Sequence, residues 1–279
     1  MMSYTMARQI KQEKIDIRAM CALTKELGMD GIDFVTTYGT DPKDISKIVR
    51  EYELKVVCYT FFANLATSDK QQRSGAIDAV KQGIETATIL GTDTIMIPVD
   101  NHEKLPRNES KLYAIQELSK ASVLTREAGI TLTIENFPGH LSPFVTSEDF
   151  LEAARQVEGL KLTFDNGNVL TGGEDPACSF ERTSEYIVHA HFKDWICVDE
   201  SQGEEIKGLD GRTYKAALIG EGIVDHLACL RAMRSSGYSG YINIEYEGND
   251  YPPDVSVRKA LAYLRGLALK LESESKREK

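Results

Sequence analysis

Four acidic or imidazole side chains stand at the ends of strand-like segments in the second half of the chain. Glu135 follows the run ITLTI, Asp165 follows LKLTF, His191 lies within IVHAHF, and Glu245 follows YINI. A charged group that closes a buried strand is costly unless it is paired or coordinates a metal ion. Because the four recur at the interval of a βα unit, we predict that they meet on one rim and form a single metal site.

The donor set of this predicted site consists of three carboxylates and one neutral imidazole. Such a mostly oxygen set suits Mn²⁺, Mg²⁺ or Co²⁺, and Zn²⁺ is also acceptable to it. We expect one divalent ion, with Mn²⁺ as the first choice. The alternative interpretation is that some of these residues are unrelated strand-end groups that touch solvent or pair with lysines. That explanation is weaker for all four residues together than for any one alone.

The elements that must position these residues alternate between short β-branched runs and helix-like stretches. Several joints repeat the order helix, glycine, strand, as at Gly91 and Gly129, where glycine can take the left-handed conformation that ends a helix. Asp41 before a proline, and Thr146 three residues before Asp149, are start signals for helices. The chain therefore predicts repeated βα units.

Alternating β and α elements predict a parallel sheet, and eight units in about 250 residues favour a closed barrel over an open sheet. We predict an α/β fold with a single-domain (β/α)8 TIM barrel over residues 1–271, followed by a charged, disordered tail at 272–279. The eight expected strands are Ser3–Met6, Gly31–Val35, Lys55–Thr60, Thr94–Val99, Thr131–Ile134, Lys161–Phe164, Tyr186–Phe192 and Tyr241–Ile244.

Composition limits the compartment and the partners of the protein. The net charge of −10 opposes broad binding to nucleic acid or to an anionic membrane. No stretch has the length and apolar character of a membrane span, and the N-terminus lacks the apolar core of a signal peptide. Five scattered cysteines without a CxxC pair suit a reducing compartment. We expect a cytoplasmic protein with a small-molecule partner, and homo-oligomerisation is left open.

Five motifs in order carry a resemblance to a known family. They are IEN at 134–136, FDNGN at 164–168, HAHFKD at 189–194, GEGIVD at 220–225 and GYINIE at 240–245. In this order and spacing the chain resembles the xylose isomerase-like TIM-barrel superfamily of sugar phosphate isomerases and epimerases. The resemblance implies that Glu135, Asp165, His191 and Glu245 are the metal ligands. It also implies that Glu135 and Glu245 act as an acid/base pair on opposite faces of the substrate.

Two positions depart from the pattern of the sugar epimerases in this superfamily. Their Asp-x-x-His motif ends in a histidine that helps to hold the substrate, whereas here that place belongs to Asn168, which we expect to bind substrate instead. A substrate-binding arginine often follows the metal-binding histidine by six residues, and here that residue is Cys197. Both departures argue against a simple ketose 3-epimerase. Endonuclease IV, the DNA-repair relative, uses three metals and many histidines, which this acidic chain with 5 histidines lacks.

Three further residues have both a functional and a structural interpretation. His191, Lys193 and Trp195 share the period of a strand, so they face the same side. Lys193 would then stabilise a developing oxyanion, or else pair with Asp194 at the surface. Trp195 would stack on a sugar ring or pack a loop. His140, just beyond the strand that ends near Glu135, would be a general base or a solvent-exposed loop histidine.

The connection from Trp195 to Leu218 is long and polar, so it is either a lid that binds substrate through Arg212, Tyr214 and Lys215 or a solvated loop. Glu221 and Asp225 come next, near an expected helix start where many barrels bind phosphate. Their charge would compete with a phosphate group. These residues favour an uncharged sugar.

The predicted activity is that of a metal-dependent sugar isomerase or epimerase, which removes a proton next to a carbonyl and passes through an enediolate. The alternative is a lyase or dehydratase that acts on a keto-sugar, an inosose or a 3-keto-glycoside, because loss of a β-substituent can follow from the same intermediate. A weaker alternative is a non-catalytic sugar-binding barrel.

Overall fold

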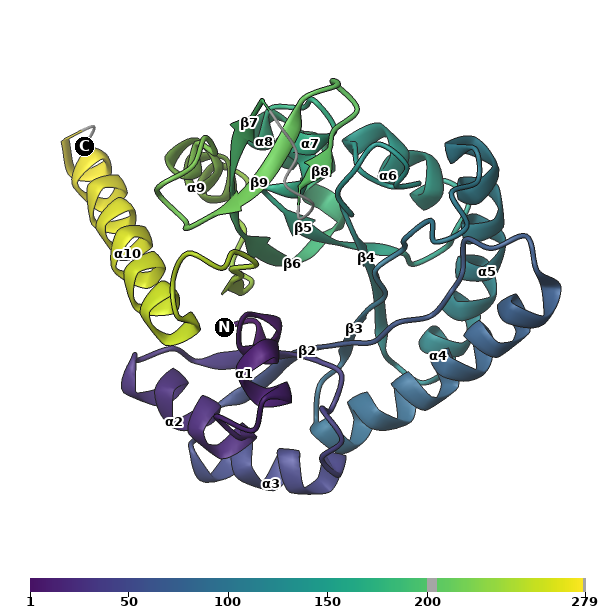
Figure 1. Cartoon of the computed structure of the whole chain (residues 1–279), viewed down its shortest axis with the longest axis horizontal. Helices are drawn as coiled ribbons and strands as arrows, with labels where there is room; N and C mark the ends of the chain where they lie inside the picture. Colours follow the sequence, from purple (N-terminus) through teal and green to yellow (C-terminus); the bar gives the residue numbers. More distant parts are fainter. Residues whose placement is uncertain (200–204, 278–279) are drawn as a thin grey trace.

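The computed structural model describes residues 1–199 and 205–277. Its main sheet is parallel and curves into a nearly closed barrel with helices around it, so the predicted TIM-barrel fold is confirmed (Figure 1). The strand order is β1-β2-β3-β4-β5-β6-β10. The strands are β1 (Gly31–Val35), β2 (Lys55–Thr60), β3 (Thr94–Met96), β4 (Thr131–Glu135), β5 (Lys161–Asp165), β6 (Ile187–Phe192) and β10 (Ile242–Ile244).

The expected first strand at Ser3–Met6 is wrong, because these residues form a 3₁₀ helix, η1. The gap between β10 and β1 is instead bridged by Met1 and Met2, the two residues before η1. Met2 N–H donates to the carbonyl of Ile244 (3.1 Å), and Asp33 N–H donates to the carbonyl of Met1 (3.0 Å). Beyond this bridge the Ser3 hydroxyl accepts from Val35 N–H (2.8 Å), so a side chain takes the place of a strand backbone.

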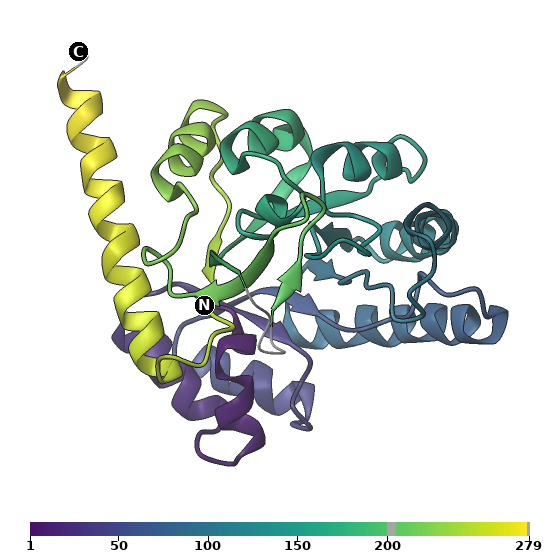
Figure 2. The same cartoon turned by 45° about the horizontal axis from the view of Figure 1, so that its top comes forward.

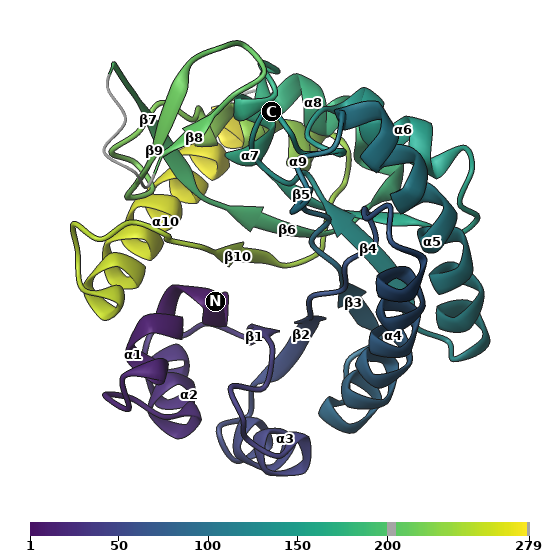
Figure 3. The same ribbon diagram turned by 45° about the vertical axis from the view of Figure 1, so that its right-hand side comes forward.

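Helices cover the outside of the sheet, as Figure 3 shows for α2 to α6. The predicted start signals are confirmed: Asp41 accepts from Lys43 N–H (2.8 Å), and Thr146 and Asp149 form a reciprocal capping box. The helices are α1 (Ala7–Lys11), α2 (Ile17–Glu26), α3 (Pro42–Glu51), α4 (Lys70–Leu90), α5 (Arg107–Glu127), α6 (Ser147–Ala154), α7 (Asn168–Thr171), α8 (Pro176–Thr183), α9 (His226–Ser235) and α10 (Pro253–Arg277), with the short 3₁₀ helix η2 (Ser184–Tyr186) before β6.

The C-terminal helix α10 lies along the outside of the barrel (Figure 2). It continues past Leu271 to Arg277, so residues that were expected to belong to a disordered tail are helical. Residues 278–279 of that expected tail lie outside the described residues. The division into a barrel and a tail stays a prediction.

The apolar core lies between the barrel strands and the helices around them. Phe34, Ile95, Ile134, Phe164 and Phe192, from five different strands, are fully buried. Among the described residues, no helix is both long enough and apolar enough to cross a membrane.

The long connection after β6 forms a small antiparallel sheet of order β7-β9-β8, which we call the lid sheet. Its strands are β7 (Asp194–Val198), β8 (Ile206–Lys207) and β9 (Thr213–Ala217). Residues 200–204 of this connection lie outside the described part. The lid sheet is tied to the barrel loops, since His140 N–H donates to the carbonyl of Lys207 (2.8 Å). The described residues of this connection therefore form an ordered sheet and not a solvated loop. Their role as a lid that binds substrate stays a prediction.

Candidate metal centre and active site

The four strand-end residues of the predicted metal site come together in space. Glu135 ends β4, Asp165 ends β5, His191 is the second-last residue of β6, and Glu245 directly follows β10. These strands are neighbours in the sheet, and their carboxyl ends meet at one rim. One ligand atom from each residue lies within 4.8 Å of all the others, and all four residues are buried.

Two oxygen atoms in this cluster lack a hydrogen-bond partner. Asp165 Oδ1 accepts from the backbone N–H groups of Gly167 (2.9 Å) and Asn168 (2.8 Å), but Asp165 Oδ2 accepts none. Glu245 Oε2 is also without a hydrogen bond. Burial raises the pKa of Asp165 to about 6 and that of Glu245 well above its ordinary value. Such atoms need either a proton or a cation.

Lys193 brings a positive charge to the same cluster. Its Nζ lies 3.2 Å from Asp165 Oδ2 and 3.1 Å from Glu245 Oε2, and it donates to Glu247 Oε1 at 2.8 Å. Burial alone would lower the pKa of Lys193, but Asp165, Glu245 and Glu247 raise that pKa well above its usual range. Lys193 is therefore a buried ammonium beside the predicted ligands, as expected from the strand period, and not a surface partner of Asp194.

Glu247 was not anticipated from the sequence. It lies two residues after Glu245, and both side chains contact Lys193. The strand period that linked His191 to Lys193 would have found it, had that period been applied beyond the end of β10.

Asp33 was also missed, although it lies inside the buried strand β1. Its Oδ2 is 2.8 Å from Nε2 of His191 and 2.8 Å from Nε2 of His189. Burial would raise the pKa of Asp33, but the hydrogen bonds from the two histidines hold it well below its usual range. The same cost of a charge within a strand that singled out Asp165 applies to Asp33.

His191 links the two groups of residues through its two ring nitrogens. Nε2 faces Asp33, whereas Nδ1 lies 3.2 Å from Glu135 Oε2 and 3.6 Å from Glu245 Oε2. Burial lowers the pKa of His191, but hydrogen bonds to Asp33 and Glu135 outweigh it and raise the pKa well above the ordinary value. A carboxylate that accepts from the far nitrogen of a metal-binding histidine fixes its orientation and tautomer. Asp33 is placed for that task.

Asn168 lies at the start of α7 and is fully buried. It borders a cavity of about 320 Å³, together with Glu135, Lys193, Glu245 and Glu247. Neither the oxygen nor the nitrogen of its carboxamide has a hydrogen-bond partner. Asn168 can therefore donate to a ligand in this cavity and accept from it, which agrees with the expected substrate contact.

Trp195 is only 1 % exposed and does not border this cavity. Its ring lies against the lysine, with Lys193 Nζ at 6.0 Å from the ring centroid. A Cβ at Gly167 would collide with both Lys193 and Trp195, so the glycine permits their close packing. In this structure the ring supports Lys193, and the stacking of Trp195 on a sugar stays a prediction.

His140 and Arg212 are not brought to the cavity either. His140 is exposed, and its Nδ1 lies 3.2 Å from the carbonyl of Lys207, so it joins a barrel loop to the lid sheet. Arg212 is exposed and binds Asp210, with Nε 2.6 Å from Oδ2. The roles of His140 as a general base and of Arg212 as a substrate contact therefore stay predictions, since neither residue borders the cavity in this structure. Of the other lid residues proposed, Tyr214 is buried and Lys215 lies 3.7 Å from Asp250.

The expected phosphate loop is already occupied by a carboxylate of the protein. Asp194 Oδ2 accepts from the N–H groups of Gly220 (2.9 Å) and Gly222 (3.1 Å), and Oδ1 accepts from Val224 N–H (3.0 Å). A Cβ at Gly222 would collide with Asp194. His226 Nε2 also lies 3.2 Å from Asp194 Oδ2. The carboxylate of Asp194 therefore occupies the amide donors of this loop.

Glu221 and Asp225 differ in how they lie at this loop. The carboxylate of Glu221 points to Tyr251 and Lys259, with hydrogen bonds of 2.9 and 3.1 Å. Asp225 caps α9 by accepting from Ala228 N–H (2.9 Å). Neither residue borders the 320 Å³ cavity. Asp225 thus places negative charge at the start of α9 as expected, Glu221 is turned away from it, and Asp194 is the carboxylate that holds the loop amides.

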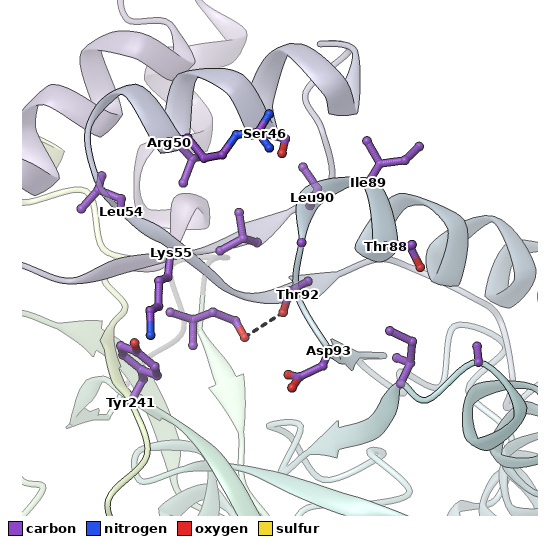
Figure 4. Close-up of a pocket in the computed structure, with 16 residues that line it drawn as sticks. Ser46, Arg50, Leu54, Lys55, Thr88, Ile89, Leu90, Thr92, Asp93 and Tyr241 are labelled. Atoms are coloured by element: carbon purple, nitrogen blue, oxygen red, sulfur yellow. Dashed lines mark hydrogen bonds between the residues drawn. The ribbon is translucent and has the colours of Figure 1, made fainter.

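A second, larger cavity of about 870 Å³ lies at the opposite end of the strands (Figure 4). It is bordered by Lys55 at the start of β2 and by Thr92 and Asp93 just before β3. Thr92 donates to the carbonyl of Val57 at 3.1 Å. In parallel barrels the amino ends of the strands serve stability, and chemistry takes place at the carboxyl ends. The smaller cavity is therefore the candidate active site.

Comparison with known proteins agrees with this architecture. A curated inosose dehydratase from Lacticaseibacillus casei is 24 % identical over 236 residues, which cover 79 % of this chain and 78 % of that protein. The solved structure of a probable 3-DHS dehydratase from Bacillus anthracis has a TM-score of 0.76 at 16 % identity, covering 95 % of this chain and 97 % of that one. A 3-keto-D-glucoside 4-epimerase from E. coli has a TM-score of 0.70 at 16 % identity, covering 90 % and 94 %.

The family model described as xylose isomerase-like TIM barrel matches residues 21–267, which include every strand of the barrel sheet and all four predicted ligands. On this match, the chain belongs to the xylose isomerase-like TIM-barrel family.

Proposed function

We propose that this protein is a divalent-metal-dependent enzyme that removes a proton next to the ketone of an uncharged carbohydrate. The observation that carries the proposal is the buried cluster of Glu135, Asp165, His191 and Glu245 at one rim of the barrel. Its orphaned carboxylate oxygens lie beside a cavity of small-molecule size.

The residues present fit a divalent cation. Asp165 Oδ2 and Glu245 Oε2 are buried acceptors without hydrogen bonds, and His191 directs Nδ1 toward Glu135 and Glu245. Three carboxylates and an imidazole would hold Mn²⁺, with Mg²⁺, Co²⁺ or Zn²⁺ as alternatives. When bound there, a divalent ion supplies Lewis acidity toward the carbonyl and hydroxyl oxygens of a substrate.

The protein's own residues divide the remaining work. Glu135 and Glu245 come from β4 and β10 and both border the cavity, so each can exchange a proton with a substrate carbon or oxygen. The ammonium of Lys193 stabilises negative charge that develops on a carbonyl oxygen. Asn168 has a free carboxamide donor and acceptor with which to orient a hydroxyl group.

Dehydration is the outcome that the sequence relatives favour, since several curated relatives that match over most of the chain are inosose dehydratases. In that reaction one carboxylate removes the C–H proton, a carbon–carbon double bond forms, and the β-hydroxyl leaves. Glu245 borders the cavity, so it can return a proton to the departing hydroxyl as it becomes water.

An isomerase or epimerase is the second candidate. The observation in its favour is the presence of two buried glutamates from different strands in one cavity, because proton return to another carbon or face needs a second acid. A non-catalytic barrel is the third candidate, and it would leave the gathering of three buried carboxylates around His191 and Lys193 without a purpose.

The loop after the lid sheet supports a substrate without a phosphate group. Asp194 already accepts from the amides of Gly220, Gly222 and Val224, so those donors are not available to a phosphate. The expectation of an uncharged sugar therefore remains, but it rests on Asp194 rather than on Glu221.

The test is a screen of Mn²⁺-loaded protein in D₂O against inososes, ketoses and 3-keto-glycosides. Deuterium incorporation next to the ketone with loss of water supports the dehydratase. Deuterium incorporation with no leaving group supports the isomerase or epimerase. If no substrate class exchanges, or if exchange is the same after the metal is removed by a chelator, the proposed function is wrong.

A further inference from the structure

The wall of the 320 Å³ cavity is divided according to the order of the strands. Its charged and amide side chains come from the half of the barrel made by β4, β5, β6 and β10. The facing half, made by β1, β2 and β3, contributes Val35, Met96, Phe62 and Pro98. The two halves therefore offer a substrate opposite chemistries across one cavity.

The apolar half brings the hydroxyl of Thr60 to the cavity, where it is already engaged, and Tyr4 of η1 adds a second hydroxyl. Thr60, the last residue of β2, donates its hydroxyl hydrogen to Asp33 Oδ1 at 3.2 Å. On the loops above this half, Phe137 and Pro138 follow β4, and Ile206 of the lid sheet completes the rim. A substrate that fills the cavity therefore meets mainly apolar atoms along this side.

Phe62 lies at the mouth of the cavity and is 58 % exposed. Its neighbour Phe61 is buried and stacks on Tyr59, with ring centroids 5.8 Å apart, so the core takes one aromatic ring and leaves the other outside. An exposed phenylalanine beside Pro98, Phe137 and Ile206 forms an apolar rim without serving the core. Such a rim fits an apolar or aromatic group.

The polar half can satisfy only part of a sugar. Asn168 has a free donor and acceptor, and the glutamates and Lys193 bind oxygen atoms, but all of them lie on one side. A free hexose or cyclic polyol has hydroxyl groups around its whole ring, so those turned toward Val35, Met96 and Phe62 would be buried without partners. Binding is weakened when a polar group loses water and gains no hydrogen bond.

We infer that the substrate is a keto-carbohydrate with an apolar, ring-sized substituent, such as a glycoside with an aromatic aglycone. This inference rests on the proposed function and names the substrate class of that site. The keto-sugar lies against the polar half beside Glu135, Asn168 and Glu245. The substituent lies against the apolar half, under Phe62 and Ile206.

The test compares methyl and phenyl glycosides of one 3-keto-hexose, with an inosose as a third substrate, on Mn²⁺-loaded protein in D₂O. The rate of deuterium incorporation gives kcat/KM for each. We expect the phenyl glycoside to exceed the methyl glycoside by roughly tenfold or more, since burial of a ring contributes far more than burial of a methyl group.

The variant Phe62→Ser should reduce the phenyl-to-methyl ratio toward one, and Ile206→Ser provides a second variant if the first does not fold. Leu112→Ser is the matched control, because Leu112 is 57 % exposed on α5, away from the cavity. Its ratio should equal that of the unaltered protein.

Two results overturn the inference while the proposed function stands. One is exchange in which the phenyl glycoside has no advantage over the methyl glycoside or the inosose. The other is an unchanged ratio in both rim variants; if light scattering then shows that these variants lose a dimer, the rim is a contact between copies of the chain. If none of the three substrates exchanges, nor any of the ketoses, the proposed function itself fails and the inference falls with it.

Discussion

His191 presents its two ring nitrogens to different groups, and this decides which nitrogen can bind the metal. Nε2 lies 2.8 Å from Asp33 Oδ2, and Nδ1 faces Glu135 and Glu245. A histidine binds metal only through a deprotonated nitrogen, so a hydrogen bond from Nε2–H to Asp33 leaves Nδ1 as the ligand. In the absence of metal, the raised pKa of His191 favours protonation of both nitrogens.

The first prediction at the residue scale concerns Asp165. The variant Asp165→Ala should weaken Mn²⁺ binding by more than about a hundredfold, because it removes a ligand and not merely a supporting contact. Isothermal titration calorimetry measures the affinity, and circular dichroism should show an intact barrel. Asp93→Ala, at the opposite end of the strands, is the control and should bind metal normally. Unchanged affinity in Asp165→Ala would remove Asp165 from the site.

The second prediction concerns Asp33, which supports a ligand without being one of the four. Asp33→Asn should lower Mn²⁺ affinity by about 10- to 100-fold while the stoichiometry of binding is retained, as is usual for partners of a metal-binding histidine. His140→Asn is a suitable comparison, since His140 is exposed and contacts only the lid sheet in the structure described here. An Asp33→Asn variant with full affinity would show that Asp33 does not orient His191.

At the scale of elements, the lid sheet is anchored by one aspartate. Asp194 is the first residue of β7, and its carboxylate gathers the amides of the loop that leads from β9 to α9. The next residue back along the chain is Lys193, whose ammonium lies in the metal cluster. The junction that holds the lid sheet therefore also sets the position of Lys193.

The third prediction tests this junction through a glycine. Gly222→Ala should destabilise the protein by about 1–3 kcal/mol, because the new methyl group must displace Asp194 from its amide donors. Gly75→Ala in α4 meets open space and should be neutral or stabilising by up to about 1 kcal/mol. Urea denaturation gives both free energies of unfolding. Equal stability of the two variants would contradict the role assigned to Asp194.

Seven of the eight strands expected from periodicity are present, and the one that is not is the first, Ser3–Met6. Ser3–Met6 contains residues that a strand accepts, but the Ser3 hydroxyl bonds to β1 and the chain turns into η1. A side-chain substitute for a backbone ladder leaves no periodic signal in the sequence. The lid sheet was equally hidden, since β8 has only two residues.

In the candidate site, too, residues marked by a local sequence pattern could be predicted, and residues that meet only through the fold could not. The four predicted ligands follow buried runs and were visible as a repeated pattern. Asp33 lies inside its run instead of at the end, and it meets His189 and His191 only because closure of the barrel brings β1 near β6, with β10 between them. The sequence could not place the side chains of His140 and Arg212, because a loop position close to a ligand in sequence does not say which way the side chain turns.

At the scale of the whole molecule, burial of several carboxylates makes the metal centre a proton-linked site. The pKa of Asp165 is raised from 3.8 to about 6, mainly by burial. A carboxyl whose pKa rises on folding contributes stability below its unfolded value, and this contribution is lost as pH rises through the folded value. The metal-free barrel therefore bears an ionised, buried group above about pH 6. A bound divalent ion would neutralise that group.

The fourth prediction follows from this linkage. The increase in Tm caused by Mn²⁺ should be small at about pH 5, where protons occupy Asp165, and should grow as the pH rises past about 6. Differential scanning fluorimetry with and without Mn²⁺ gives this difference. Ca²⁺-free buffers of equal ionic strength at each pH provide the control. An increase that is constant from acid to neutral pH would mean that Asp165 does not exchange a proton for the metal.

The packing of Trp195 against Lys193 has a practical consequence for spectroscopy. Trp195 is the one tryptophan of the chain, and the ammonium of Lys193 lies 6.0 Å from its ring centroid. Arrival of a divalent cation would change the field around the indole, because Asp165 and Glu245 would turn their charge from the lysine to the ion. Intrinsic fluorescence of the unlabelled protein should therefore report occupancy of the active site directly, in real time and without a substrate.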